Sequence, residues 1–400
     1  MIEYPYMDPL KNPFSPGAGT PPPELAGRTE ILSKAKLALA RIKARRPEKS
    51  FFLVGLRGVG KTVLLHRIEE MAVEEGYKAV MIEARENKDL AELLIPHLRK
   101  LLFSLDVGKM VSDKVKRAYR VFKSFTLKVK PDGAFEVGLD IDPERGTADS
   151  GDLETDLTQL FVVLGEAALD RSTAIAIIID EIQYLNDEEL SSLIMAIHKI
   201  TQKALPLILI GAGLPQLLGK AGNAKSYAER LFDYPEVGPL TNEAAIYALQ
   251  EPVNQQNESF SENALKEILT VTEKYPYFLQ EWGYQAWQLG NHGVPININV
   301  AKSATELSIT RMDNNFFRVR FDRLTPKEKE YLRAMAELGQ GPHRSGDIAD
   351  ILKTGVRTVA PIRGKLIKKG MIYSPAHGDT AFTVPLFADF MKRIIPNFEK

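Results

Sequence analysis

Two kinds of hydrophobic pattern alternate along the first half of the chain. Short, almost wholly apolar runs that suit buried strands occur at residues 51–54, 79–82, 174–179 and 207–210. Segments with apolar residues at every third or fourth position lie between them, at residues 31–42, after Lys61, and at residues 89–102 and 188–200. Strands that alternate with helices are typical of an α/β domain with a parallel sheet. The pattern therefore predicts an α/β core over residues 28–240.

Residues 125–141 interrupt this alternation. Apolar and polar residues alternate from Phe125 to Lys130, a Pro-Asp-Gly turn follows, and the alternation resumes from Phe135 to Ile141. A period of two on both sides of a turn predicts a β-hairpin with one apolar face. No role for this hairpin follows from the sequence.

The regions on either side of the core have different patterns. Residues 1–27 contain so many prolines, including the run at 21–23, that an extended segment without helices is expected. Residues 241–322 show helical periodicity alone, which predicts a helical lid. Its tryptophans, Trp282 and Trp287, are expected to be core residues.

The last residues, 323–400, predict a winged-helix domain. Thr325 and Glu328 form a capping box that announces one helix, a second follows Ser345, and a third spans about residues 358–369. Two short strands are expected at residues 371–374 and 381–384, joined by a turn that contains Gly378.

Composition narrows the possible functions. The 400 residues include no cysteine, which excludes disulfides, thiolate metal sites and cysteine nucleophiles. No apolar run approaches the roughly 18 residues of a membrane helix, so a cytoplasmic protein without membrane contacts is expected. The six histidines show no metal-ligand spacing. The net charge is zero, yet residues 323–400 carry 14 Lys and Arg against 8 Asp and Glu. That imbalance fits either a nucleic-acid-binding module or a solvated basic face.

One motif carries specific chemistry. The run Gly55-Leu56-Arg57-Gly58-Val59-Gly60-Lys61-Thr62 has the pattern of a phosphate-binding P-loop between a strand and a helix. In such a loop the backbone N–H groups of Gly55 and Gly58 to Val63 surround phosphates, and Lys61 reaches the β- and γ-phosphates. The hydroxyl of Thr62 would hold Mg²⁺, so ATP and Mg²⁺ are the expected ligands.

A second motif completes the site. The apolar strand at residues 174–179 ends in Asp180 and Glu181. Asp180 would hold the Mg²⁺ together with Thr62, and Glu181 would polarise an attacking water molecule. The two motifs together predict an ATPase.

With these motifs, the chain resembles the AAA+/STAND-type P-loop ATPases that are related to replication-initiator (origin-recognition-like) proteins. The resemblance extends from about Pro13 onward and rests on the P-loop and on residues 24–28, 178–181, 211–215, 227–232 and 275–279. It implies that Arg28 lies near the adenine, that Arg230 is an arginine finger, and that Pro276 links the nucleotide to the lid. If Arg230 acts on the nucleotide of a neighbouring subunit, hydrolysis would depend on a nucleotide-dependent homo-oligomer.

One feature departs from that family. The apolar strand at 207–210 continues into Gly211-Ala212-Gly213, without the polar side chains that usually orient the lytic water there. Slow turnover is therefore expected, and the protein is interpreted as an ATP-dependent switch.

The C-terminal domain leaves two functions open. Its third helix presents a basic set that suits the backbone of double-stranded DNA, namely Arg357, Arg363, Lys365, Lys368 and Lys369. A DNA-associated initiator-type ATPase is one hypothesis. The other is a STAND-type signalling or defence switch, in which the winged helix is a regulatory or protein-contact module. A small-molecule kinase is disfavoured, because no acceptor pocket is evident.

Overall fold

The structure, a computed structural model, describes residues 6–17, 19–86, 88–106, 112–130, 142–339, 341–376 and 378–398. The chain forms two compact units. We name residues 30–55 and 61–236 the core unit, and residues 1–29, 56–60 and 237–400 the C-terminal unit.

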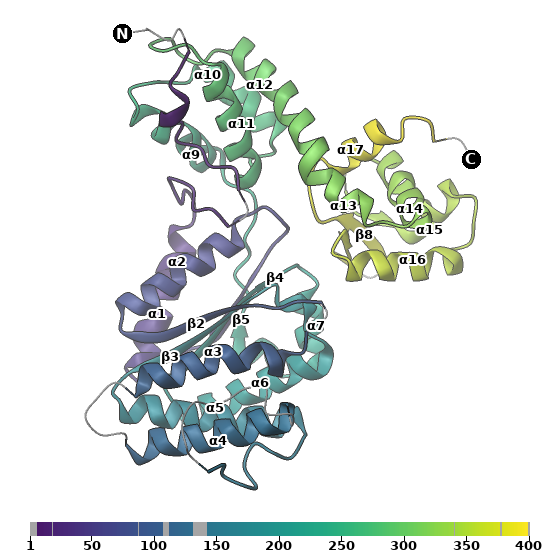
Figure 1. The fold of residues 1–400 in the computed structure, drawn as a ribbon. Coiled ribbons are helices and arrows are strands. Elements are labelled where there is room, and N and C mark those ends of the chain that lie inside the picture. The colour runs from purple at the N-terminus through teal and green to yellow at the C-terminus, as the bar shows by residue number, and fades with distance from the viewer. Residues whose placement is uncertain are drawn as a thin grey trace. The chain divides into compact units, whose positions relative to one another are not determined.

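A five-stranded parallel sheet lies at the centre of the core unit (Figure 1); the sequence predicts its parallel arrangement and four of its strands. Its order is β2-β3-β4-β1-β5, formed by β1 (Ser50–Val54), β2 (Tyr77–Glu83), β3 (Ala174–Asp180), β4 (Leu207–Gly213) and β5 (Phe232–Asp233). Every residue of β1, β3 and β4 is buried. Strands covered on both faces are continuously apolar, which is why the sequence reveals them, whereas the two residues of β5 give no such signal.

Helices connect these strands and cover the sheet. They are α1 (Thr29–Lys43), α2 (Lys61–Glu74), α3 (Leu90–Leu105), α5 (Leu153–Asp170), α6 (Asp187–Gln202), α7 (Leu217–Ala224) and α8 (Ala228–Leu231). Helix α2 packs against β2, β3 and β4, and the sheet also contacts α3, α5 and α6. Across the described ranges, no helix combines the length and the apolarity that crossing a bilayer demands.

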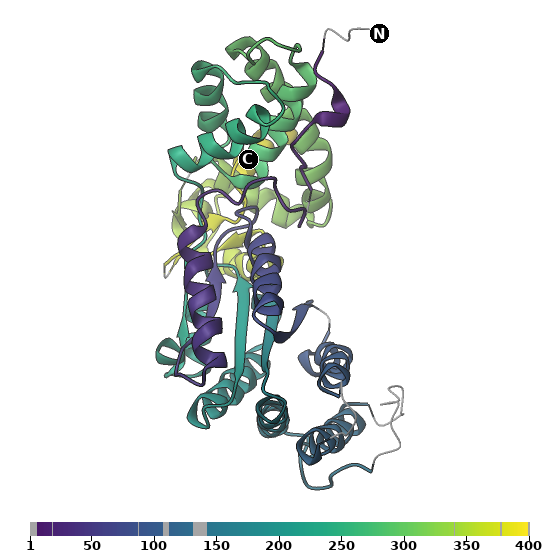
Figure 2. The same cartoon turned by 90° about the vertical axis from the view of Figure 1, so that its left-hand side faces the viewer.

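Helix α4 (Asp113–Val129) corrects the predicted hairpin. Residues 125–129 are its last turns and not a strand, while residues 131–141, the predicted turn and second arm, lie outside the described residues. Ser112 caps the helix by accepting a hydrogen bond from the N–H of Val115 at 3.3 Å. The buried positions run at helical spacing through Phe122 to Phe125, so the six-residue alternation was an incidental match to a strand. Helix α4 packs on α5 and α3, in a layer farther from the sheet (Figures 1 and 2).

The C-terminal unit begins with the helices of the predicted lid. These are α9 (Asn242–Asn254), α10 (Glu262–Val271), α11 (Pro276–Leu289) and α12 (Ile298–Arg311). Trp282 and Trp287 are each 1% exposed, which confirms them as core residues. The N-terminal segment contains a short 3-10 turn, η1 (Pro9–Lys11), and a β-bridge from Tyr6 to Asn291, and it packs on α11. There the indole of Trp287 donates to the carbonyl of Asp8 at 2.9 Å.

Helix α12 continues through a π-helical turn, η3 (Met312–Phe317), into α13 (Arg318–Asp322). The remaining residues form what we call the C-terminal module, residues 323–398. It contains α14 (Pro326–Glu337), α15 (Ser345–Ile351), α16 (Val356–Lys368), α17 (Phe387–Ile394) and a sheet of order β6-β8-β7, formed by β6 (His343–Arg344), β7 (Ile372–Tyr373) and β8 (Asp379–Phe382). The capping box at Thr325 and Glu328 is confirmed.

Candidate functional site

The glycine-rich loop joins β1 to α2, as the sequence predicts. Strand β1 ends at Val54 and α2 begins at Lys61. Gly58 and Gly60 have φ angles of 85° and 92°, a region that side chains disfavour, so glycine is needed at both positions. Since the first N–H groups of a helix have no partner within it, the loop and the start of α2 form a region that attracts anions.

Lys61, the first residue of α2, is 8% exposed. Its Nζ donates to the carbonyl of Gly55 at 3.0 Å, which folds the side chain back over the loop. Val63 lies two residues further along α2 and is half-buried.

Thr62 and Asp180 are brought together, although 118 residues separate them in sequence. The Oγ1 of Thr62 donates to Oδ2 of Asp180 at 2.6 Å, and the N–H of Glu181 donates to Oδ1 at 2.8 Å. Burial raises the pKa of Asp180, and these two hydrogen bonds oppose that shift. A hydroxyl and a carboxylate are hard oxygen ligands of the kind that Mg²⁺ prefers, so this pair fits a magnesium site.

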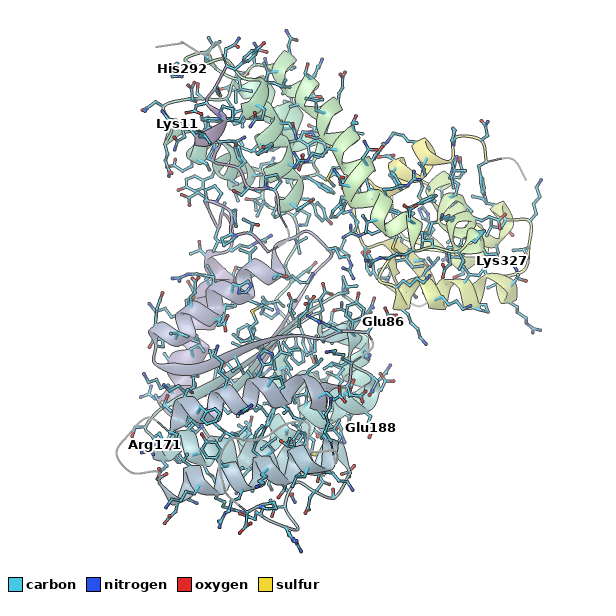
Figure 3. The ribbon with its side chains drawn as sticks, viewed as in Figure 1. Lys11, Glu86, Arg171, Glu188, His292 and Lys327 are labelled. Carbon is cyan, nitrogen blue, oxygen red and sulfur yellow. The ribbon has the colours of Figure 1, made fainter. Side chains whose placement is uncertain are left out.

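Glu181 follows β3 directly and has the left-handed backbone angles φ 53° and ψ 35°. Such angles are uncommon for a residue with a side chain and frequently occur at functional sites. Its carboxylate accepts a hydrogen bond from the side-chain amide of Gln183, in the 3-10 turn η2 (Ile182–Tyr184). Helix α6 starts shortly after this turn, and Figure 3 labels Glu188 in its first turn.

The loop residues 56–60 also make contacts within the C-terminal unit. The guanidinium of Arg28, 8% exposed, donates to the carbonyl of Val59 at 3.0 Å and to that of Gly238 at 2.6 Å. Burial lowers the pKa of Arg28. Arg28 therefore supports the loop through its side chain, a role that the sequence pattern did not reveal.

Two further hydrogen bonds connect the loop to helix α11 and to the C-terminal module. The N–H of Tyr277 donates to the carbonyl of Gly58 at 3.2 Å, and the N–H of Arg57 donates to the carbonyl of Thr383 at 3.2 Å. Pro276, the first residue of α11, immediately precedes Tyr277. Nothing in the local sequence around Thr383 indicated this contact, because it depends on tertiary packing.

The remaining predicted residues lie on the surface or in other networks. Arg230 is exposed on α8. On α16, Arg357, Lys365 and Lys368 are exposed. Arg363 instead donates to Oγ1 of Thr380, Oγ of Ser374 and the carbonyl of Asp379, at 2.8, 2.7 and 2.9 Å.

Lys369 also has partners inside the module. Its Nζ lies 2.7 Å from Oε2 of Glu328 and donates to the carbonyl of Arg323 at 3.1 Å. The structure thus divides the predicted basic set into three exposed residues and two that stabilise the module itself.

Two segments of the chain match known protein families. Residues 24–210 match the family described as the AAA ATPase domain, and residues 314–391 match a domain of unknown function. None of the curated proteins matches the chain in sequence.

Among solved structures, the chain is similar to the Walker-type ATPase paby2304 of Pyrococcus abyssi, with 18% identity and a TM-score of 0.57 over 93% of this chain and 97% of that one. It also matches the Aeropyrum pernix ORC1 protein, solved in complex with DNA, at 17% identity and a TM-score of 0.46 over 93% and 94%. A third match is the Thermotoga maritima RuvB Holliday junction branch migration motor, at 15% identity and a TM-score of 0.41 over 94% and 96%.

A glycine-rich loop between a parallel strand and a helix, with a paired hydroxyl and carboxylate beside it, defines a P-loop ATPase core. This geometry agrees with the match of residues 24–210 to the AAA ATPase domain family.

Proposed function

We propose that the protein is an ATP-dependent switch: it binds ATP with Mg²⁺ at the P-loop, hydrolyses it slowly, and couples the nucleotide state to its C-terminal module. The observation that carries the proposal is the 2.6 Å hydrogen bond between Thr62 and Asp180, which joins the two halves of an ATPase site from distant parts of the sequence.

The roles follow from the chemistry of each group. Backbone N–H groups of Gly58, Val59 and Gly60 would receive the phosphates, and Lys61 would exchange its bond to Gly55 for the β- and γ-phosphates. Thr62 and Asp180 would hold Mg²⁺, which neutralises charge on the phosphate oxygens when bound.

Glu181 would orient the attacking water molecule. It is half-buried, directly follows Asp180 and has its carboxylate fixed by Gln183. A base held within hydrogen-bonding distance of the reacting proton contributes about 10² to 10⁴ in rate. We assign it this role by its position beside the metal-binding pair.

Coupling would pass through the loop itself. Arg57 and Gly58 lie inside the phosphate-binding motif and contact Thr383 and Tyr277 respectively. A nucleotide that attracts the N–H of Arg57 competes with the carbonyl of Thr383 for the same donor. Occupation of the loop is thereby linked to the position of the C-terminal module.

The module is proposed to be a winged helix that binds double-stranded DNA. The exposed side chains of Arg357, Lys365 and Lys368 on α16 support phosphate contacts. The internal hydrogen bonds of Arg363 and Lys369 favour the second candidate, a STAND-type switch in which the module regulates the loop or contacts a protein.

Arg230 is proposed as an arginine finger for a neighbouring subunit. Its exposure on α8 supports a role outside its own subunit. Hydrolysis would then depend on a nucleotide-dependent homo-oligomer.

Steady-state ATP hydrolysis tests the proposal. We expect magnesium-dependent phosphate release by the wild-type protein and its loss in Asp180→Asn. Asp170→Asn is a matched control, because Asp170 is exposed at the end of α5. Equal turnover by Asp180→Asn and the wild type would contradict the proposal.

A further inference from the structure

The end of β4 presents a problem for an ATPase. Its last residues, Gly211 to Gly213, are buried and carry no polar side chain. They lie beside β3, whose end carries Asp180 and Glu181. A polar group that fixes the catalytic carboxylate must therefore come from another segment.

Gln183 brings such a group to this place. Its side chain is 8% exposed, and its Oε1 accepts a hydrogen bond from the N–H of Leu214, the residue after β4, at 3.1 Å. Because Leu214 offers a donor, the atom that faces it must be the amide oxygen. The amide nitrogen is then left to donate to the carboxylate of Glu181.

The glycine at position 213 makes room for this amide. A Cβ at Gly213 would lie 2.9 Å from Oε1 of Gln183 and 3.1 Å from Cγ2 of Ile182. Such contacts are closer than van der Waals packing allows, so a side chain at this position would move the Gln183 amide. The absence of larger residues at the end of β4 is what admits the polar group from the neighbouring turn.

Helix α7 also holds the backbone of η2. The Nζ of Lys220, on α7, donates to the carbonyls of Gln183 and Leu185. With its backbone held by Lys220 and its amide held by Leu214, Gln183 has little freedom to move away from Glu181.

We propose that Gln183 is the positioning residue for Glu181: a glutamine from η2 fixes the carboxylate that would orient the attacking water. The inference rests on the proposed ATP hydrolysis. Its side-chain amide donates to the Glu181 carboxylate and thereby fixes the orientation of that carboxylate.

Two substitutions separate positioning from a structural role. Gln183→Glu keeps an oxygen for the Leu214 N–H, but it loses the donor to Glu181 and adds a like charge beside it. Gln183→Met keeps the length and loses both hydrogen bonds. The matched control is Gln202→Glu, the same change at an exposed position on α6.

The measurement is the steady-state kcat and KM of ATP hydrolysis at neutral pH, with urea unfolding of each variant alongside. A hydrogen bond to a charged group corresponds to about a tenfold effect or more. We therefore expect kcat to fall at least about tenfold in both Gln183 variants, with KM within about twofold of the wild type. Gly213→Ala should reproduce the Gln183→Met result, because its Cβ displaces the amide.

Wild-type kcat in both Gln183→Glu and Gln183→Met would overturn the inference while leaving the proposed function intact. Wild-type protein that binds ATP and Mg²⁺ without hydrolysing ATP would overturn both the inference and the proposed hydrolysis. This outcome is distinct, because it is seen in the wild type alone.

Discussion

The hydrogen bond from Thr62 to Asp180 allows a quantitative prediction for Thr62→Ala. The carboxylate of Asp180 belongs to a residue that is only 5% exposed, and the hydroxyl of Thr62 and the N–H of Glu181 both donate to it. Removing the hydroxyl leaves a buried charge with one fewer donor. A hydrogen bond to a charged group contributes about 1.5–3 kcal/mol, so the free energy of unfolding should fall by about that amount at neutral pH. Thr62→Ser keeps the hydroxyl and should lose less than about 1 kcal/mol.

The pH dependence of this loss has a definite sign. Burial raises the pKa of Asp180 above its value in the unfolded chain, and the hydrogen bond from Thr62 lowers it. A raised pKa means that the folded state binds more protons than the unfolded one. The buried charge of Asp180 therefore lowers the free energy of unfolding at pH values above the folded-state pKa, and this destabilisation is relieved as the pH falls through that pKa. Because Thr62→Ala increases the destabilisation, the difference in free energy of unfolding between Thr62→Ala and the wild type should narrow on acidification.

Urea unfolding followed by circular dichroism and tryptophan fluorescence measures this difference. Both tryptophans, Trp282 and Trp287, lie in the C-terminal unit, so fluorescence follows that unit, whereas circular dichroism follows the whole chain. The loss should appear in the circular dichroism transition. Equal free energies of unfolding for Thr62→Ala and Thr62→Ser at neutral pH would contradict this prediction. So would a difference between Thr62→Ala and the wild type that widens on acidification.

Three further predictions concern the proposed cycle. Glu181→Gln should bind ATP with wild-type affinity and accumulate in the ATP-bound state, which rapid filtration with labelled nucleotide measures; wild-type turnover by this variant would remove Glu181 from the mechanism. The specific ATPase activity of the wild type should rise with protein concentration, and Arg230→Ala should remove this dependence. An unchanged dependence in Arg230→Ala would show that Arg230 is an ordinary surface charge. Duplex DNA binding, measured by fluorescence anisotropy, should weaken with salt by about 0.9 log units per log unit for each phosphate contacted. Lys365→Ala and Lys368→Ala should each reduce that slope, and a flat salt response would favour a protein partner.

The sequence predicts the centre of the fold well, for a physical reason. Strands β1, β3 and β4 are buried on both faces and must be apolar throughout, and the loop after β1 needs glycines at fixed positions. The capping box at Thr325 is equally local, since the side chains of Thr325 and Glu328 each bond the other's backbone.

Features that depend on tertiary contacts could not be predicted. The last turns of α4 have a strand-like alternation over six residues, and only the longer helical spacing from Val115 onward reveals the helix. Arg363 has the same local context as its exposed neighbours, yet the strands beside α16 supply its partners. The contact of Arg57 with Thr383 joins segments more than 300 residues apart, so no local pattern could encode it.

Calorimetric titration with ATP and Mg²⁺ tests whether the P-loop binds a nucleotide. We expect saturable binding heat with the wild-type protein, its loss in Lys61→Ala, and unchanged binding in Lys199→Ala, which removes an exposed lysine of α6. The absence of binding heat in the wild type at several temperatures, or equal binding by Lys61→Ala, would contradict it.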